Sequence, residues 1–155
     1  SSTEIGELFH PAGSQGDELL PNDLRAETQL ETLNRAKRVH LKTFVREHCL
    51  SQKLNVLIDQ ETGSVAEIFA QALKEQRQAR TFGMNTSGQV VMAQWFPLSI
   101  LGSSEYYISI PVAGFLSHHK RKIEGEGVSA QIILDYQLEL EKQGRDSWVE
   151  AALQM

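Results

Sequence analysis

Apolar side chains recur along the chain with the spacings of both helices and strands, and this pattern predicts an α/β protein. From Asp23 to His48 the spacing is about that of a helix, which indicates one long amphipathic helix or two. Leu54–Ile58 is an apolar run ended by the polar Asp59, as is typical of a buried strand. After Gly63, apolar positions three and four residues apart predict a helix over Ser64–Gln76. A strand therefore leads directly into a helix at Ser64.

The second half of the chain is rich in β-branched and aromatic residues. It predicts three strands and, after a glycine-rich turn, a short apolar segment and two helices. These are Thr81–Met84, Val90–Phe96, Tyr106–Val112, Ile132–Leu134, Tyr136–Lys142 and Asp146–Leu153, with Asp146 capping the last helix. Aromatic residues on the middle strands are expected to pair in the core rather than to form a substrate platform: Trp95, Phe96, Tyr106 and Tyr107.

Residues 1–21 combine two prolines and three glycines with few apolar residues, which predicts a flexible N-terminal segment. The remainder, 22–155, has the length of a single domain with one core. The chain begins with Ser1 rather than Met, so we interpret it as an excised piece or a processed product. No run of about 18 apolar residues is present, so no membrane span is predicted.

The formal net charge of −5 argues against a protein that binds nucleic acid through basic patches. The only cysteine, Cys49, excludes an intrachain disulfide and a cysteine-based metal cluster, and we expect a buried apolar role for it. His40 and His48, eight residues apart, are expected to be packed helix residues. His118 and His119, followed by three cationic residues, are expected to form a solvated strand end. No metal or other cofactor is therefore predicted.

Ser64 stands at the predicted strand-to-helix turn, where a serine has two possible roles. A turn of this kind exposes the hydroxyl and leaves backbone N–H groups unpaired, as a nucleophile and its oxyanion donors require. Ser64-x-x-Glu67 is also the pattern of a capping box, in which the same serine only begins the helix. The pattern alone favours the cap.

The segment LNVLIDQETGSVAEIFAQAL, residues 54–73, resembles the nucleophile segment of the C-terminal-processing, or tail-specific, serine peptidases. That family usually shows a hydrophobic strand, then Thr-Ala-Ser-Ala-Ser-Glu, then an Ile-Phe-Ala-type helix. The resemblance continues in order to the end of the chain, through Arg80–Gly83, Thr86–Gly88, Ile123–Val128 and the closing Gly144–Asp146. It implies an α/β fold of the Clp-protease and crotonase type, with a mixed sheet and packed helices, in which the peptidase-like part begins at about residue 54.

The resemblance implies that Ser64 is the nucleophile and that the Val65 N–H is an oxyanion donor. In the Ser/Lys branch of the family the base stands twenty-five residues after the serine, which is Gln89 here, and the assisting residue four positions later is Ala93. An amide cannot act as a general base, so this dyad is absent.

A second branch, resembling the tricorn-type and chlamydial secreted members, uses serine, histidine and a glutamate in the Ile-Glu-Gly turn. Glu124 occupies that place and would orient an imidazole. No upstream segment resembles the motif of the family's histidine, and His10 is the only loop candidate. The family's Asp-Leu-Arg-x-Asn-x-Gly-Gly loop is also missing, because Asn22–Arg25 shares only its letters.

The resemblance therefore implies a hydrolase, a serine-peptidase-family domain that cleaves peptide or protein substrates and lacks its general base. A peptide or protein substrate is the expected partner, homo-oligomerisation would allow another copy to complete the site, and the family's usual setting is periplasmic or otherwise extracytoplasmic. The alternative is a catalytically inactive peptide-binding or assembly module on the same fold, in which Ser64 is only a helix cap.

Overall fold

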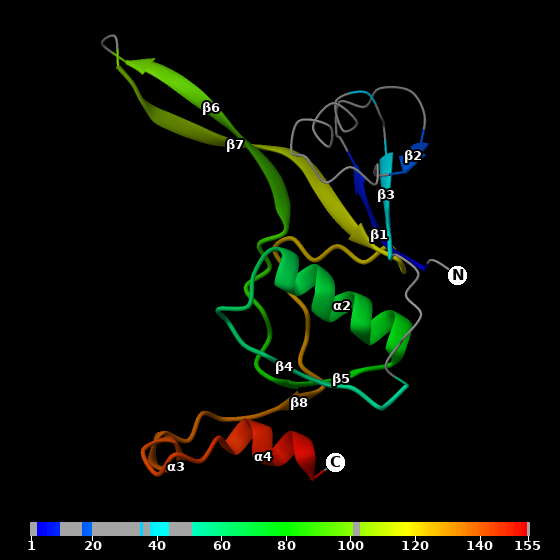
Figure 1. Ribbon diagram of the computed structural model, residues 1–155, viewed down its shortest axis with the longest axis vertical. Coiled ribbons are helices and arrows are strands. Elements are labelled where there is room, and N and C mark those ends of the chain that lie inside the picture. Colours follow the sequence, from blue (N-terminus) through cyan, green and yellow to red (C-terminus); the bar gives the residue numbers. More distant parts are fainter. Residues whose placement is uncertain are drawn as a thin grey trace.

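The computed structural model describes residues 3–9, 17–19, 35, 38–43, 51–100 and 103–154. These residues form an α/β fold with two sheets, as the sequence predicted (Figure 1). The elements are β1 (Glu4–Phe9), β2 (Asp17–Leu19), β3 (Arg38–Lys42), β4 (Asn55–Ile58), α2 (Val65–Arg77), β5 (Arg80–Gly83), β6 (Val91–Ile100), β7 (Ser103–Ser117), β8 (Ile132–Ile133), α3 (Leu138–Glu141) and α4 (Ser147–Leu153).

Strands β4, β5 and β8 form a parallel sheet in that order, and α2 is the crossover between the first two. Helix α4 packs against β4 and β5. Asn55 donates to the Ala152 carbonyl oxygen at 2.5 Å, and a Cβ at Gly83 would lie 2.5 Å from the Trp148 ring. The closing helix thus fixes the sheet whose first strand leads into Ser64.

The other sheet is mixed and has the order β2-β3-β1-β7-β6. Strand β1 pairs antiparallel with both β3 and β7, while β2 pairs parallel with β3. The main core joins this sheet to α2, β4 and the segments around residues 90 and 123–128. Its buried members are Leu8, Val39, Ile58, Ala70, Val90, Ala113, Phe115, Ile123 and Val128.

The prediction of a flexible segment over residues 1–21 is wrong at 4–9 and 17–19, which are strands. Leu8 in β1 is only 5% exposed and belongs to the core, so the ordered part does not start after Pro21. The partners of β1 are Arg38–Lys42 and Gly114–Ser117, far along the chain. A short segment without internal periodicity gives no local sign of such pairing.

The prediction of helix over Asp23–His48 is wrong at 38–42, where β3 is a strand. Arg35 is helical, Thr43 follows the strand, and the other residues of that range, including His48, lie outside those described. Val39 is fully buried in β3. His40, predicted on a helix, lies in this strand with Nδ1 3.3 Å from a Glu4 carboxylate oxygen. Pairing on both edges therefore outweighed a helical spacing that extended across the segment.

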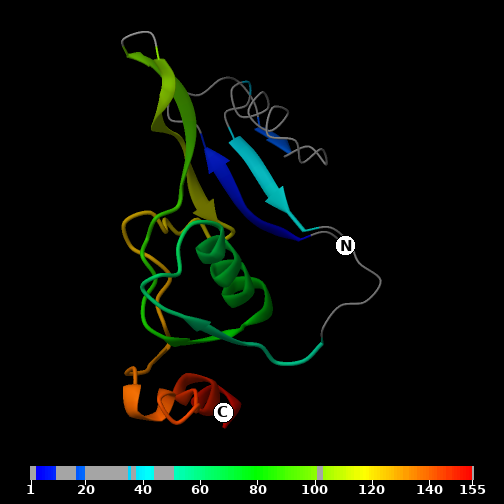
Figure 2. The same cartoon turned by 60° about the vertical axis from the view of Figure 1, so that its left-hand side comes forward.

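The predicted burial of the aromatic residues on β6 and β7 is also wrong. The two strands form a hairpin that extends away from α2 (Figures 1 and 2). Trp95 is 67% exposed, and Phe96, Tyr106 and Tyr107 are exposed as well. Residues 90–117 contain a single charged residue, Glu105. The strands were predicted correctly, but a strand pattern does not reveal whether another layer covers each face.

The elements predicted after residue 54 are confirmed to within a few residues, except that β7 is longer and α3 shorter than expected. Asp146 caps α4, because its carboxylate accepts from the N–H groups of Trp148 at 2.9 Å and Val149 at 3.0 Å. His118 and His119 lie in a turn after β7 rather than on the strand.

Candidate active site

Ser64 occupies a strained strand-to-helix turn. It is exposed, it precedes the first residue of α2, and its backbone has φ 57° and ψ −126°. A helix-capping residue ordinarily has extended backbone angles, and a non-glycine residue in this region costs about 1–3 kcal/mol. Ser64 and Glu67 have the arrangement of a capping box, yet the Ser64 hydroxyl makes no capping hydrogen bond. The Glu67 N–H instead donates to the Ser64 carbonyl oxygen at 3.0 Å.

The Glu67 carboxylate, fully buried, holds this turn in place. It accepts from the N–H groups of Ser64 at 3.0 Å, Gly88 at 2.7 Å and Gln89 at 2.9 Å, and from the Thr86 hydroxyl at 2.5 Å. The Ser64 N–H also donates to the Gln89 carbonyl oxygen at 3.0 Å. The serine turn and residues 86–89 are therefore joined through one carboxylate.

The loop that precedes Ser64 is fixed by its own side chains. Asp59 Oδ1 accepts from the N–H groups of Glu61 and Thr62 and from the Thr62 hydroxyl, at 2.8–3.0 Å. The Thr62 carbonyl oxygen in turn accepts from the N–H of Ser87 at 3.1 Å. The loop before Ser64 and the neighbouring segment at Ser87 are thus held in place by hydrogen bonds.

The turn that carries Glu124 is attached to the same segment. Its Oε2 accepts from the Val90 N–H at 2.5 Å, and the Gly125 N–H donates to the Gly88 carbonyl oxygen at 2.8 Å. Gly127, with φ 74°, packs so tightly that a Cβ there would lie 2.4 Å from the Thr86 carbonyl oxygen. Ser64 is therefore hydrogen-bonded to Gln89, and Glu124 is hydrogen-bonded to the next residue, Val90.

This arrangement supplies several parts of a nucleophilic site. The Val65 N–H stands at the first position of α2, where helix geometry provides no intrahelical acceptor. The positive end of the helix dipole favours negative charge developing there. Of the two Glu124 carboxylate oxygens, only Oε2 accepts a hydrogen bond from a described residue, which leaves Oε1 for a further donor. The side chain of Gln89, the residue beside Ser64, is exposed.

Among the described residues, no histidine is hydrogen-bonded to Ser64 or Glu124. His40 faces Glu4, and His119 faces Glu75 with 4.0 Å between Nδ1 and Oε1. His10 and Cys49 lie outside the described residues. In the described ranges, no three histidine, cysteine, aspartate or glutamate side chains are grouped so that they could hold a metal ion. Nor is any described helix long and apolar enough to span a bilayer.

The segments that form this site lie within a range of the chain that matches a known protein family. Residues 9–134 match peptidase family S41. The chain belongs to that family. No curated protein sequence matches the chain. The family assignment establishes a serine-peptidase-family domain, related to the C-terminal processing peptidases.

Two solved structures of similar proteins agree with the fold. A putative peptidase from Parabacteroides merdae has a TM-score of 0.60 at 17% identity, covering 76% of this chain and 36% of its own. Mature CPAF with lactacystin has a TM-score of 0.59 at 19% identity, covering 76% and 22%. A photosystem II D1 C-terminal processing protease is 29% identical over 55% of this chain and 21% of its own, with a TM-score of 0.47. This S41 chain thus spans about a fifth to a third of their lengths.

Sequence reasoning missed the second role of Glu67. The spacing Ser64-x-x-Glu67 indicated a capping box, whereas most of the hydrogen bonds to this carboxylate come from residues 86–89. One sequence signal could have revealed this second role. It is a carboxylate that follows a candidate nucleophile by one helical turn and lies beside a face predicted to be buried. The contribution of the Gln89 backbone left no mark in the sequence, because any residue type can supply it.

Proposed function

We propose that this S41 domain carries the nucleophilic part of a serine peptidase site. In this proposal, Ser64 attacks the carbonyl carbon of a peptide bond, the Val65 N–H stabilises the oxyanion, and Glu124 orients a histidine from outside the described residues. The observation that supports it best is the strained backbone of Ser64. A residue that serves only as a helix cap has no need of this conformation.

The assignment to the Ser/His/Glu branch rests on two positions. Gln89 stands beside Ser64 where the Ser/Lys branch has its base, and an amide cannot accept the serine proton at neutral pH. Glu124 is held against the neighbouring Val90. The histidine then comes either from chain upstream of this segment or from a second copy. The exposed β6–β7 hairpin, which has Glu105 as its single charged residue, offers a surface for such assembly.

Peptide or protein substrates and an extracytoplasmic location complete the proposal, and both follow from the family resemblance. The second candidate is an inactive peptide-binding or assembly module on the same fold. The specific observation in its favour is Gln89, which leaves Ser64 with no base among the described residues.

The proposal is tested by intact-mass analysis after treatment with a fluorophosphonate probe. If a second copy supplies the histidine, a single adduct on the folded wild type is expected, lost in Ser64→Ala and in heat-denatured protein but retained in Ser129→Ala, a matched exposed serine. If the histidine lies upstream, the wild type stays unlabelled. The variant Gln89→Lys places an amine where the Ser/Lys branch has its base and is expected to increase labelling at Ser64. An adduct that persists in Ser64→Ala, or no adduct on either wild type or Gln89→Lys, contradicts the proposal and favours the inactive module.

A further inference from the structure

The turn from His118 to Lys122, here called the basic turn, places five consecutive histidine, lysine or arginine side chains at the surface. All five residues are exposed, in a chain whose net charge is −5. Lys74 of α2 adds to the cluster: burial lowers the pKa of Lys74, and the nearby Arg121 charge lowers it further. Positive charge is thus gathered at one place on an acidic protein.

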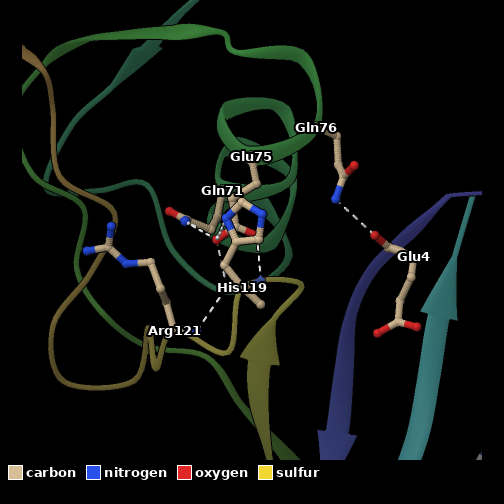
Figure 3. Close-up of polar contacts among 7 residues, drawn as sticks. Glu4, Gln71, Glu75, Gln76, His119 and Arg121 are labelled. Carbon is tan, nitrogen blue, oxygen red and sulfur yellow. Dashed lines mark hydrogen bonds and ion pairs between the residues drawn. The ribbon is translucent and has the colours of Figure 1, made fainter.

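The basic turn is built around Ser117, which is fully buried at the end of β7. The Ser117 N–H donates to the Arg121 carbonyl oxygen at 3.0 Å, and its hydroxyl oxygen accepts from the Arg121 N–H at 3.0 Å. The Ser117 hydroxyl donates to Glu75 Oε1 at 2.7 Å, and the His119 N–H donates to Glu75 Oε2 at 3.2 Å (Figure 3). The backbone of the turn is therefore fixed to α2.

A second buried carboxylate holds the turn from the other side. Glu7 of β1 is 1% exposed and lies 2.8 Å from Lys120 Nζ and 3.9 Å from Arg38 Nη1. Lys120 itself has φ 60°, an uncommon conformation for a non-glycine residue. Two inward carboxylates, from α2 and β1, thus stabilise a turn whose backbone is strained.

These inner contacts leave three side chains of the turn unpaired. Within the described ranges, no carboxylate pairs with His118, Arg121 or Lys122, and Figure 3 shows the Arg121 guanidinium turned away from Glu75. The His118 ring is tilted against the His119 ring, with centroids 5.2 Å apart. The charges of Arg121 and Lys122 repel each other, so an anionic partner would gain from both.

The basic turn runs directly into the candidate active site. Lys122 precedes Glu124 by two residues, which extended chain covers in at most about 7 Å. Glu124 is hydrogen-bonded to Val90, and the neighbouring Gln89 is hydrogen-bonded to Ser64. A polypeptide that lies across Ser64 is therefore within reach of Arg121 and Lys122, whereas a flat membrane surface would not need to be near the serine.

We propose that the basic turn is a docking site for an acidic segment of the polypeptide substrate, with Arg121 and Lys122 as its main contacts. This inference rests on the proposed function for the identity of the partner. It adds the chemical class that the substrate presents near its cleavage site, namely a run of aspartate or glutamate residues.

The test measures binding without catalysis, on the full chain with Ser64→Ala. Fluorescence anisotropy is recorded with a fluorescein-labelled hexaglutamate peptide and with a hexaglutamine peptide of equal length. We expect salt-dependent binding of the glutamate peptide alone, weakened at least tenfold by Arg121→Gln with Lys122→Gln. The matched control is Lys42→Gln with Lys142→Gln, which removes the same charge from two other exposed positions and is expected to leave the affinity unchanged.

Equal weakening by both pairs of substitutions, or no binding of the glutamate peptide, overturns the inference. Binding of phosphatidylserine vesicles without binding of the peptide would assign the turn to a membrane and overturns it as well. Peptide binding is read independently of fluorophosphonate labelling. If Ser64 is not labelled and the peptide still binds at the turn, the proposed catalysis fails while the docking site stands.

Discussion

Helix α2 carries a buried carboxylate near each end, and the two differ in what they hold. Glu67, in the first turn, accepts four hydrogen bonds that join the Ser64 turn to residues 86–89. Glu75, in the last turns, accepts from the Gln71 amide at 2.6 Å and from Ser117 and His119 of the basic turn. One helix thus positions both segments that flank the candidate site.

The electrostatic setting of the two carboxylates is opposite. The positive end of the helix dipole favours a charge at Glu67, whereas the negative end disfavours one at Glu75. Burial would raise the pKa of the Glu75 carboxyl, but its hydrogen bonds from Gln71, Ser117 and the His119 N–H, with the nearby His119 ring, hold that pKa below its usual value. Direct hydrogen bonds can therefore outweigh both burial and an unfavourable helix end.

The largest effect is expected from Glu67→Ala. The substitution leaves the N–H groups of Gly88 and Gln89 and the Thr86 hydroxyl without their acceptor in a buried site. We expect a loss of about 3–5 kcal/mol in the free energy of unfolding, measured by urea titration. The exposed Glu61→Ala is the control, and Glu67→Gln is the milder variant should the first fail to fold. A loss no greater than the control's would show that this carboxylate is not a structural clamp.

A smaller, pH-dependent effect is expected from Glu75→Gln. Because the folded-state pKa of Glu75 is lowered, its stabilisation is complete above the usual carboxyl pKa of about 4.3 and disappears as the pH falls through the lowered value. The difference in urea midpoint between wild type and variant should be present at about pH 7 and vanish in acid. Glu139→Gln, at an exposed site, should show no such trend. A difference that stays constant with pH would contradict the assignment.

The smallest effect on the free energy of unfolding is expected at Ser64, whose turn Glu67 holds in place. Glycine adopts the backbone angles of Ser64 without strain, so Ser64→Gly should be more stable than wild type by about 1 kcal/mol. Thermal or urea unfolding of wild type and of both the glycine and the alanine variants at this position measures the effect. A simple helix cap predicts instead that alanine costs about 1 kcal/mol against wild type and that glycine gives no gain over wild type.

Local patterns predicted the unit β4-α2-β5 because its contacts lie between neighbours in sequence. The spacing of Val65, Ile68 and Ala72 already marks a helix, and the apolar run before Asp59 marks a buried strand. Strands β1 and β3 could not be predicted in the same way. Their conformation depends on partners far along the chain, and Leu41 of β3 also fits the helical stripe predicted for Asp23–His48.

The candidate site was predictable as three separate segments but not as an assembly. The motifs around Ser64, Thr86 and Glu124 were identified from resemblance, and the structure joins them through hydrogen bonds to Glu67 and Val90. Most of those bonds are made by backbone N–H groups, which carry no sequence signature. The exposure of Trp95 was equally hidden, because its strand is apolar on both faces.

The place of β1 between β3 and β7 has a consequence during synthesis. Gly6 pairs with Ser117, so one edge of this early strand remains unpaired until the ribosome has translated 111 further residues. At roughly 5–20 residues per second, that wait lasts on the order of ten seconds. Leu8 would then emerge before its partner on β7, Phe115, is available. The nascent chain is thus a natural client for chaperones that bind apolar segments at the exit tunnel.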